Sequence, residues 1–168
     1  MKFDHDNISP LDSRYANKIS ELRENFSESA LIKIRFDVEI EWLLYICINL
    51  PKTFKPLSKQ SIKKIAKFKD SFDNKSVLKI KKIESTTNHD VKAVEYYIRD
   101  YFLKDKVLST YTHLIHFGLT SEDINSLSYA HMIKNGIFIY VKELDKVNKI
   151  LKNYSKKWAK QPFLARTH

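Results

Sequence analysis

The sequence predicts an all-α fold, and three observations lead to this prediction. Apolar residues make up 43% of the 168 residues and recur at three- and four-residue spacing, the period of an amphipathic helix. The chain has only two Gly and four Pro, so helix breakers are scarce. A β-sandwich needs many turns and a dinucleotide-binding sheet needs a glycine fingerprint, so the composition argues against both.

Two helices follow a loose polar start and a turn-rich segment at 9–15. We expect a helix of moderate length over 16–25 and a longer one over 27–49. Two apolar stripes run along the longer helix, so it should be buried on most of its circumference. The stripes are Leu31, Ile34, Val38, Trp42 and Tyr45, and Ile32, Phe36, Ile40, Leu43 and Cys47.

Prolines at 51 and 56 end that helix, and two shorter helices come next. Ser58 is a plausible N-cap for a helix over 59–73, and a short helix is expected over 75–84. The inward residues of the first should be Ile62, Ile65 and Phe72, with its lysines outward.

The stretch Thr86 to Asp90 is small and polar, and the helical pattern starts just after it. Thr87-x-x-Asp90 has the form of a capping box, so we expect a helix to begin near Thr87 and to run to about Leu103. Free N–H groups at such a helix start favour an anion, and His89 can exchange a proton there near neutral pH. Most capping boxes only cap, however.

A further buried element is expected over 108–119 and contains His113 and His116. Histidines three residues apart can bind a metal, but no carboxylate or Cys completes a site. We therefore interpret them as packing or hydrogen-bonded histidines and predict no metal site.

A second capping box, Thr120-x-x-Asp123, begins a helix that should continue over 124–160. The adjacent hydroxyls of Thr120 and Ser121 at a helix start suit a carboxylate. At roughly 35 residues the helix is about three times the usual length, which suits a long bundle. Gly136 interrupts the pattern; the expected inward residues are Leu127, Met132, Ile137, Val141, Leu144, Val147, Leu151 and Trp158.

The formal net charge of +10 comes from 25 Lys and only five Arg, and the lysines are spread through 52–106 and 134–160. We interpret them as a solvated surface; a basic nucleic-acid binder is the less favoured alternative. The lone Cys47 excludes an internal disulfide. The chain starts without a signal peptide and has no apolar run of membrane-spanning length, so we expect a cytoplasmic protein with no membrane partner.

Four stretches, in order, resemble the motifs of the bacterial adenylosuccinate lyases, a family of the fumarase/aspartase superfamily. They are Ser-Pro-Leu-Asp-Ser-Arg-Tyr at 9–15, Thr-Thr-Asn-His-Asp-Val-Lys-Ala-Val-Glu-Tyr at 86–96, Thr-Ser-Glu-Asp-Ile-Asn at 120–125 and Arg-Thr-His at 166–168. The resemblance covers essentially the whole chain. It departs from the family pattern where the chain stops, since the last motif normally continues into Gly-Gln-Pro.

The resemblance implies β-elimination of fumarate from adenylosuccinate, giving AMP, and from the succinyl-carboxamide intermediate of purine synthesis (SAICAR). It implies an anionic small-molecule substrate, no cofactor and a homotetramer. It also implies an N-terminal helical domain over 1–110 and the start of a central helix bundle, truncated here, over 111–168.

By position in these motifs, His168 matches the family's general acid. The matching substrate-binding residues are Arg14, Tyr15, Asn88, His89, Asp90, Thr120 and Ser121, with Lys92 as a secondary candidate. The family's catalytic base is a serine on a loop that would lie beyond residue 168, and no serine here matches its motif. We therefore expect the chain by itself to be inactive, or to be the N-terminal piece of a split or truncated enzyme.

Two other hypotheses remain open at this point: a non-enzymatic remnant or helical interaction module, and the nucleic-acid binder. The sequence does not choose between the two substrates, and it does not identify the base, the oligomeric state or a completing chain.

Overall fold

The computed structural model describes residues 8–162, 164 and 166, and it confirms the all-α prediction. Every regular element in these residues is helical. The elements are η1 (Ala16–Lys18), α1 (Ser20–Phe26), α2 (Glu28–Asn49), α3 (Lys59–Asp70), α4 (Asn74–Thr87), α5 (Asp90–Leu103), η2 (Leu108–Leu114) and α6 (Ser121–Trp158), where η marks a 3₁₀-helix.

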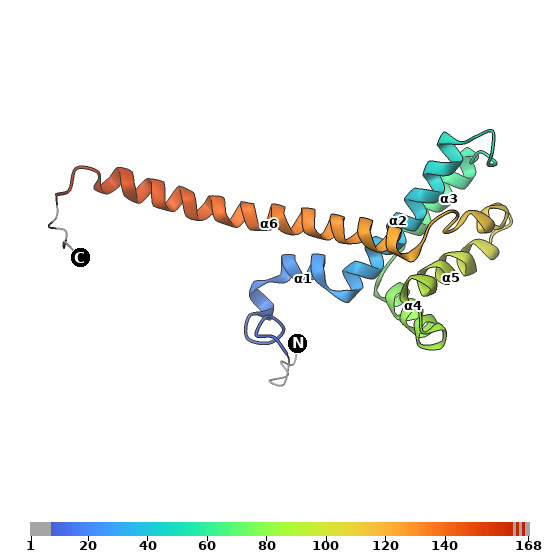
Figure 1. The fold of residues 1–168 in the computed structure, drawn as a ribbon, viewed down its shortest axis with the longest axis horizontal. Coiled ribbons are helices and arrows are strands. Elements are labelled where there is room, and N and C mark those ends of the chain that lie inside the picture. Colours follow the sequence, from blue (N-terminus) through green and yellow to red (C-terminus); the bar gives the residue numbers. More distant parts are fainter. Residues whose placement is uncertain (1–7, 163, 165, 167–168) are drawn as a thin grey trace.

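The helices form a compact group from which one long helix projects (Figure 1). Helices α2 to α5 and η2 make up the group, and α6 begins beside it and extends far beyond it. Helix α1 packs along the near part of α6 and against α2. None of the helices over the described residues combines the length and the apolar character of a membrane span.

Aromatic rings fill the centre of the helical group. Phe36 of α2 and Phe68 of α3 are fully buried and meet edge to face, with ring centroids 5.0 Å apart. Phe68 also stacks on Tyr101 of α5 at 3.6 Å. These contacts join α2, α3 and α5 around one core.

Helix α3 follows the prediction at its start but differs along its length. Ser58 is the N-cap, and its Oγ accepts a hydrogen bond from the N–H of Ser61 at 3.0 Å. Ile65 is buried and Phe72 packs on the core as expected. Ile62 is 44% exposed, so its predicted inward position is wrong: Ser61 takes the buried place in the first turn, and Phe68 takes the main inward place further along.

The far part of α6 departs from the expected inward stripe. Met132 is buried, but the other seven residues of that stripe are 43–59% exposed. For the six residues from Ile137 onward, the physical reason is that α1 and α2 pack only against the near part of the helix. Leu127 lies in that near part but is 53% exposed, because Ser128, Met132 and Gly136 take the buried places there.

Gly136 does not interrupt α6, which is continuous from Ser121 to Trp158. The glycine is explained instead by the close approach of α1. A Cβ at this position would lie 2.5 Å from Cζ of Phe26, so a side chain here would require that ring to move.

Candidate anion-binding site at two helix starts

The start of α5 is built differently from the predicted capping box. Helix α4 continues to Thr87, so the expected helix start at Thr87 is wrong. Asn88 reverses the chain in the left-handed conformation, with φ +50°, and His89 is the N-cap of α5. The Nδ1 atom of His89 accepts a hydrogen bond from the N–H of Lys92 at 3.3 Å. A short break thus separates two helices and leaves Asn88 and His89 exposed on it.

Asp90, the first residue of α5, is held by the protein's own groups. Its carboxylate accepts a hydrogen bond from the N–H of Val91 at 2.8 Å and pairs with Nη2 of Arg35 at 2.7 Å. Partial burial alone would raise the pKa of Asp90, but the Val91 N–H and the Arg35 charge together hold it below its usual value. The carboxylate is therefore ionised and oriented.

The start of α6 has the predicted capping box. The carboxylate of Asp123 accepts hydrogen bonds from the N–H of Thr120 at 2.7 Å and from its hydroxyl at 2.9 Å. These two bonds lower the pKa of Asp123. Ser121 is the first residue of the helix, at the positive end of its dipole.

Helix α2 brings the two helix starts together. Val38 of α2 forms a small buried cluster with Val91 of α5 and Ile124 of α6. Arg35, one turn earlier on α2, contacts Asp90 and donates from Nε to Oδ1 of Asn125 at 3.0 Å. Of the predicted site residues, Asp90 thus lies at the junction itself, and the two helix starts joined there carry Asn88, His89, Thr120 and Ser121.

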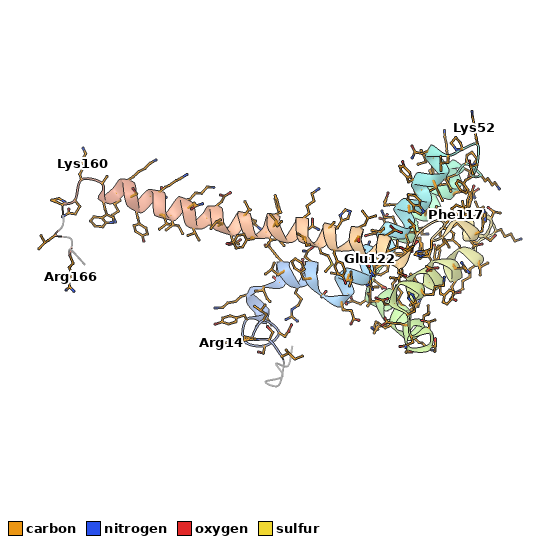
Figure 2. The ribbon with its side chains drawn as sticks, in the orientation of Figure 1. Arg14, Lys52, Phe117, Glu122, Lys160 and Arg166 are labelled. Carbon is orange, nitrogen blue, oxygen red and sulfur yellow. The ribbon has the colours of Figure 1, made fainter. Side chains whose placement is uncertain are left out.

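Arg14 and Tyr15 lie elsewhere. The guanidinium of Arg14 rests over the ring of Tyr15, 5.4 Å from its centroid, in the turn before η1. Figure 2 shows Arg14 well apart from Glu122 at the start of α6. His168, the predicted general acid, lies outside the described residues.

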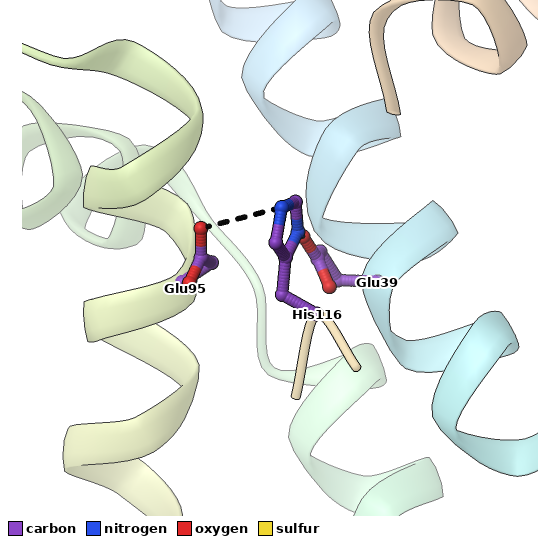
Figure 3. Close-up of side chains that lie close together, drawn as sticks. All are labelled: Glu39, Glu95 and His116. Carbon is purple, nitrogen blue, oxygen red and sulfur yellow. Dashed lines mark hydrogen bonds and ion pairs between the residues drawn. The ribbon is translucent and has the colours of Figure 1, made fainter. Parts of the chain in front are cut away.

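Sequence reasoning missed a buried charged cluster beside this junction (Figure 3). His116 lies between Glu39 of α2, whose Oε1 is 2.6 Å from Nδ1, and Glu95 of α5, whose Oε1 is 3.7 Å from Nε2. Lys92 also pairs with Glu95, at 2.7 Å. Carboxylates from α2 and α5 therefore reach His116. The three-residue spacing of His113 and His116 could not reveal these partners.

The protonation of this cluster follows from its surroundings. The hydrogen bond to Glu39 raises the pKa of His116, and the charges of Glu39 and Glu95 add to the effect. Burial raises the pKa of Glu39 as well, and its second oxygen is buried without a hydrogen-bond partner in the described part of the chain. The Glu39–His116 pair is therefore expected to keep its proton to a higher pH than either group would alone.

The same three residues are a possible donor set for a metal, since one donor atom from each lies within 4.8 Å of the others. Two donors bound to one ion at about 2.1 Å with a tetrahedral angle lie about 3.4 Å apart. The contact of 2.6 Å between Glu39 and His116 is instead that of a hydrogen bond. The geometry therefore favours the hydrogen-bonded histidine that the sequence predicted.

One sequence signal could have indicated the cluster. Glu39 follows Val38 and precedes Ile40 within an apolar helix, and Glu95 follows Ala93 and Val94 in another. A carboxylate in such a position needs a buried partner. The left-handed backbone at His116, with φ +60°, gives no comparable signal in the sequence.

Comparison with known proteins gives a consistent result. Residues 13–168 match a protein-family model described as "Lyase". The adenylosuccinate lyase of Buchnera aphidicola subsp. Schizaphis graminum is 39% identical over 164 residues, which cover 96% of this chain and 36% of the relative. That of Escherichia coli K12 is 38% identical with the same coverages, and that of Legionella pneumophila Corby is 44% identical over 132 residues, 77% of this chain and 29% of the relative. The chain spans about a third of the length of these relatives.

Proposed function

The chain belongs to the lyase family, in which its curated relatives are adenylosuccinate lyases, and on this basis we propose that it forms part of an enzyme that eliminates fumarate from adenylosuccinate, giving AMP, and from SAICAR. The observation that carries the proposal is the junction at which α2 joins the starts of α5 and α6. This junction joins the two helix starts that carry the second and third motifs, whose residues we assign to substrate binding.

The chemistry of the substrate fits two adjacent helix starts. Adenylosuccinate carries a phosphate and two carboxylates, and each helix start carries a partial positive charge that attracts an anion. Thr120 and Ser121 would hold a carboxylate at the start of α6. Asn88 and His89 would contact the substrate from the break before α5, with Asp90 orienting that break through Arg35. Lys92, paired with Glu95, stays a secondary candidate.

Elimination also needs a base for the C–H proton and an acid for the departing nitrogen. Imidazole suits the second task because its pKa lies near working pH, and we assign it to His168 by its place in the Arg-Thr-His motif. No cofactor is needed for these steps.

We further propose that the enzyme is a homo-oligomer in which Arg14 and Tyr15 serve the site of another copy. This assignment is supported by their distance from the start of α6 and by the exposed apolar residues along the far part of that helix. In this proposal, residues 1–110 form an N-terminal helical domain and residues 111–168 begin a central helix bundle. The projecting α6 would pack against other copies of the chain in the oligomer. We place the reaction in the cytoplasm, with purine synthesis.

The 168-residue chain, purified by itself, is expected to release no fumarate from adenylosuccinate. Its residues correspond to about a third of the relatives' length, and none of its serines matches the family's base loop. Fumarate formation is measured by absorbance, beside a mock purification and His168→Ala. Turnover that disappears in His168→Ala would contradict the expectation and would require a base within these residues.

Replacing Ser121 with alanine is expected to weaken adenylosuccinate binding by the chain about tenfold or more, because a hydrogen bond to a charged group contributes about 1.5–3 kcal/mol. Binding is followed by amide chemical shifts at the starts of α5 and α6. Ser126→Ala is the matched control, since Ser126 lies on the same helix and its hydroxyl donates to Glu122. Unaltered affinity in Ser121→Ala, or no shift at either helix start in the unsubstituted chain, would count against the proposed site.

A further inference from the structure

Arg35 is a buried cation on a helix that is otherwise largely apolar on its inner side. Only 5% of its surface is exposed. Burying a guanidinium is costly unless each of its donors finds a partner, so its position in the fold requires an explanation.

The two partners of Arg35 come from the two helix starts of the candidate site. Its Nη2 pairs with Oδ2 of Asp90, the first residue of α5, at 2.7 Å. Its Nε donates to Oδ1 of Asn125, in the second turn of α6, at 3.0 Å. The guanidinium is planar and rigid, so these two bonds fix the direction from Arg35 to Asp90 and the direction from Arg35 to Asn125 relative to each other.

The neighbouring apolar contacts do not by themselves set the relative orientation of α5 and α6. Val38, Val91 and Ile124 bring the three helices into contact, but the hydrophobic effect has no direction. Helices joined only in this way can slide or rotate by small amounts. A buried ion pair is also a weak device for stability, since burial offsets most of its attraction.

We propose that Arg35 is a positioning residue that sets the start of α5 relative to the start of α6, and thereby the spacing of Asn88 and His89 from Thr120 and Ser121. Its significance for substrate binding rests on the proposed function. The positioning itself is a property of this chain and is measurable without any ligand.

The test measures the distance between two spin labels, one on each helix. The labels are attached to Asp100→Cys on α5 and Ala130→Cys on α6, both exposed positions, in a Cys47→Ala background. Arg35→Met removes both bonds at similar volume, and Arg35→Lys keeps the charge but loses the fork. Lys33→Met is the matched control, since Lys33 pairs with Asp37 within α2 itself.

The expected result is a distance distribution that broadens or shifts in Arg35→Met, does so less in Arg35→Lys, and is unaltered in Lys33→Met. Adenylosuccinate binding, followed by amide shifts, should weaken about tenfold in Arg35→Met. Asn125→Ala provides a second variant, which leaves Arg35 in place, removes one bond only and should resemble Arg35→Lys.

An unaltered distribution in the folded Arg35 variants and in Asn125→Ala overturns the inference, even if thermal stability falls, because Arg35 would then only stabilise. If the unsubstituted chain binds no adenylosuccinate, the proposed function loses its support, while the label distances still decide whether Arg35 positions the helices.

Discussion

Replacing Glu39 with alanine is expected to lower the free energy of unfolding by about 3 kcal/mol at pH 6, because removal of one partner from a buried pair leaves the other charge uncompensated. Glu39 is 1% exposed and its carboxylate lies 2.6 Å from Nδ1 of His116. In the variant, the imidazolium would face only Glu95, at 3.7 Å.

The loss should shrink as the pH rises. The pKa of His116 is raised in the folded chain by its hydrogen bond to Glu39, so the stabilisation is complete below the unfolded value of about 6.5 and is lost as the pH rises through the folded value. Burial raises the pKa of Glu39 too, which acts in the same direction. Of the other charges that act on the ring, Glu95 raises its pKa and Lys92 lowers it, while Asp123 lies near enough to be influenced by the ring.

Urea unfolding followed by circular dichroism at pH 6 and pH 9 measures both effects. Glu41→Ala is the matched control: it lies on the same helix, is exposed and pairs with Lys69 at the surface, so its loss should stay within about 1 kcal/mol. Equal losses in the two variants, or a loss in Glu39→Ala that does not depend on pH, would show that the buried proton contributes nothing to stability.

Replacing Phe68 with alanine is expected to cost about 3–5 kcal/mol, the usual range for a large aromatic residue removed from a core. Phe68 is 1% exposed and stacks on Tyr101 at 3.6 Å, with Phe36 edge-on at 5.0 Å. Its removal leaves a cavity between α2, α3 and α5, where α2 and α3 pack against α5.

The thermal midpoint and the urea midpoint of Phe68→Ala measure this loss. Ile62→Ala, on the same helix but 44% exposed, is the control and should change stability by no more than about 1 kcal/mol. If the two substitutions cost the same, the aromatic cluster would not be the centre of the core.

Helix starts show how far local sequence reasoning extends. Ser58 and Thr120 were predicted as caps and are caps, because a side-chain oxygen near the first turn acts over three residues. Thr87 has the same pattern and is the last residue of α4. At that position Asn88, in the left-handed conformation, ends α4 and His89 is the N-cap of α5. Asp90 pairs instead with Arg35, 55 positions away in the sequence.

The α6 stripe and the His116 cluster show where such reasoning ended. The period of the apolar residues identified a long helix, but it could not say that the far part of this helix would be uncovered in the chain described. The three-residue spacing of His113 and His116 is one that metal-binding histidines can have, but the partners of His116 are carboxylates on α2 and α5.

The sequence by itself determined the all-α class, the approximate places of the helices and the four motifs that place the chain in its family, because periodicity, caps and motif order are properties of neighbouring residues. Only the tertiary structure decided that Arg35 joins Asp90 to Asn125 and that Glu39 and Glu95 enclose His116. These contacts depend on how three helices cross, and buried charges find partners wherever packing brings them, at any distance along the chain.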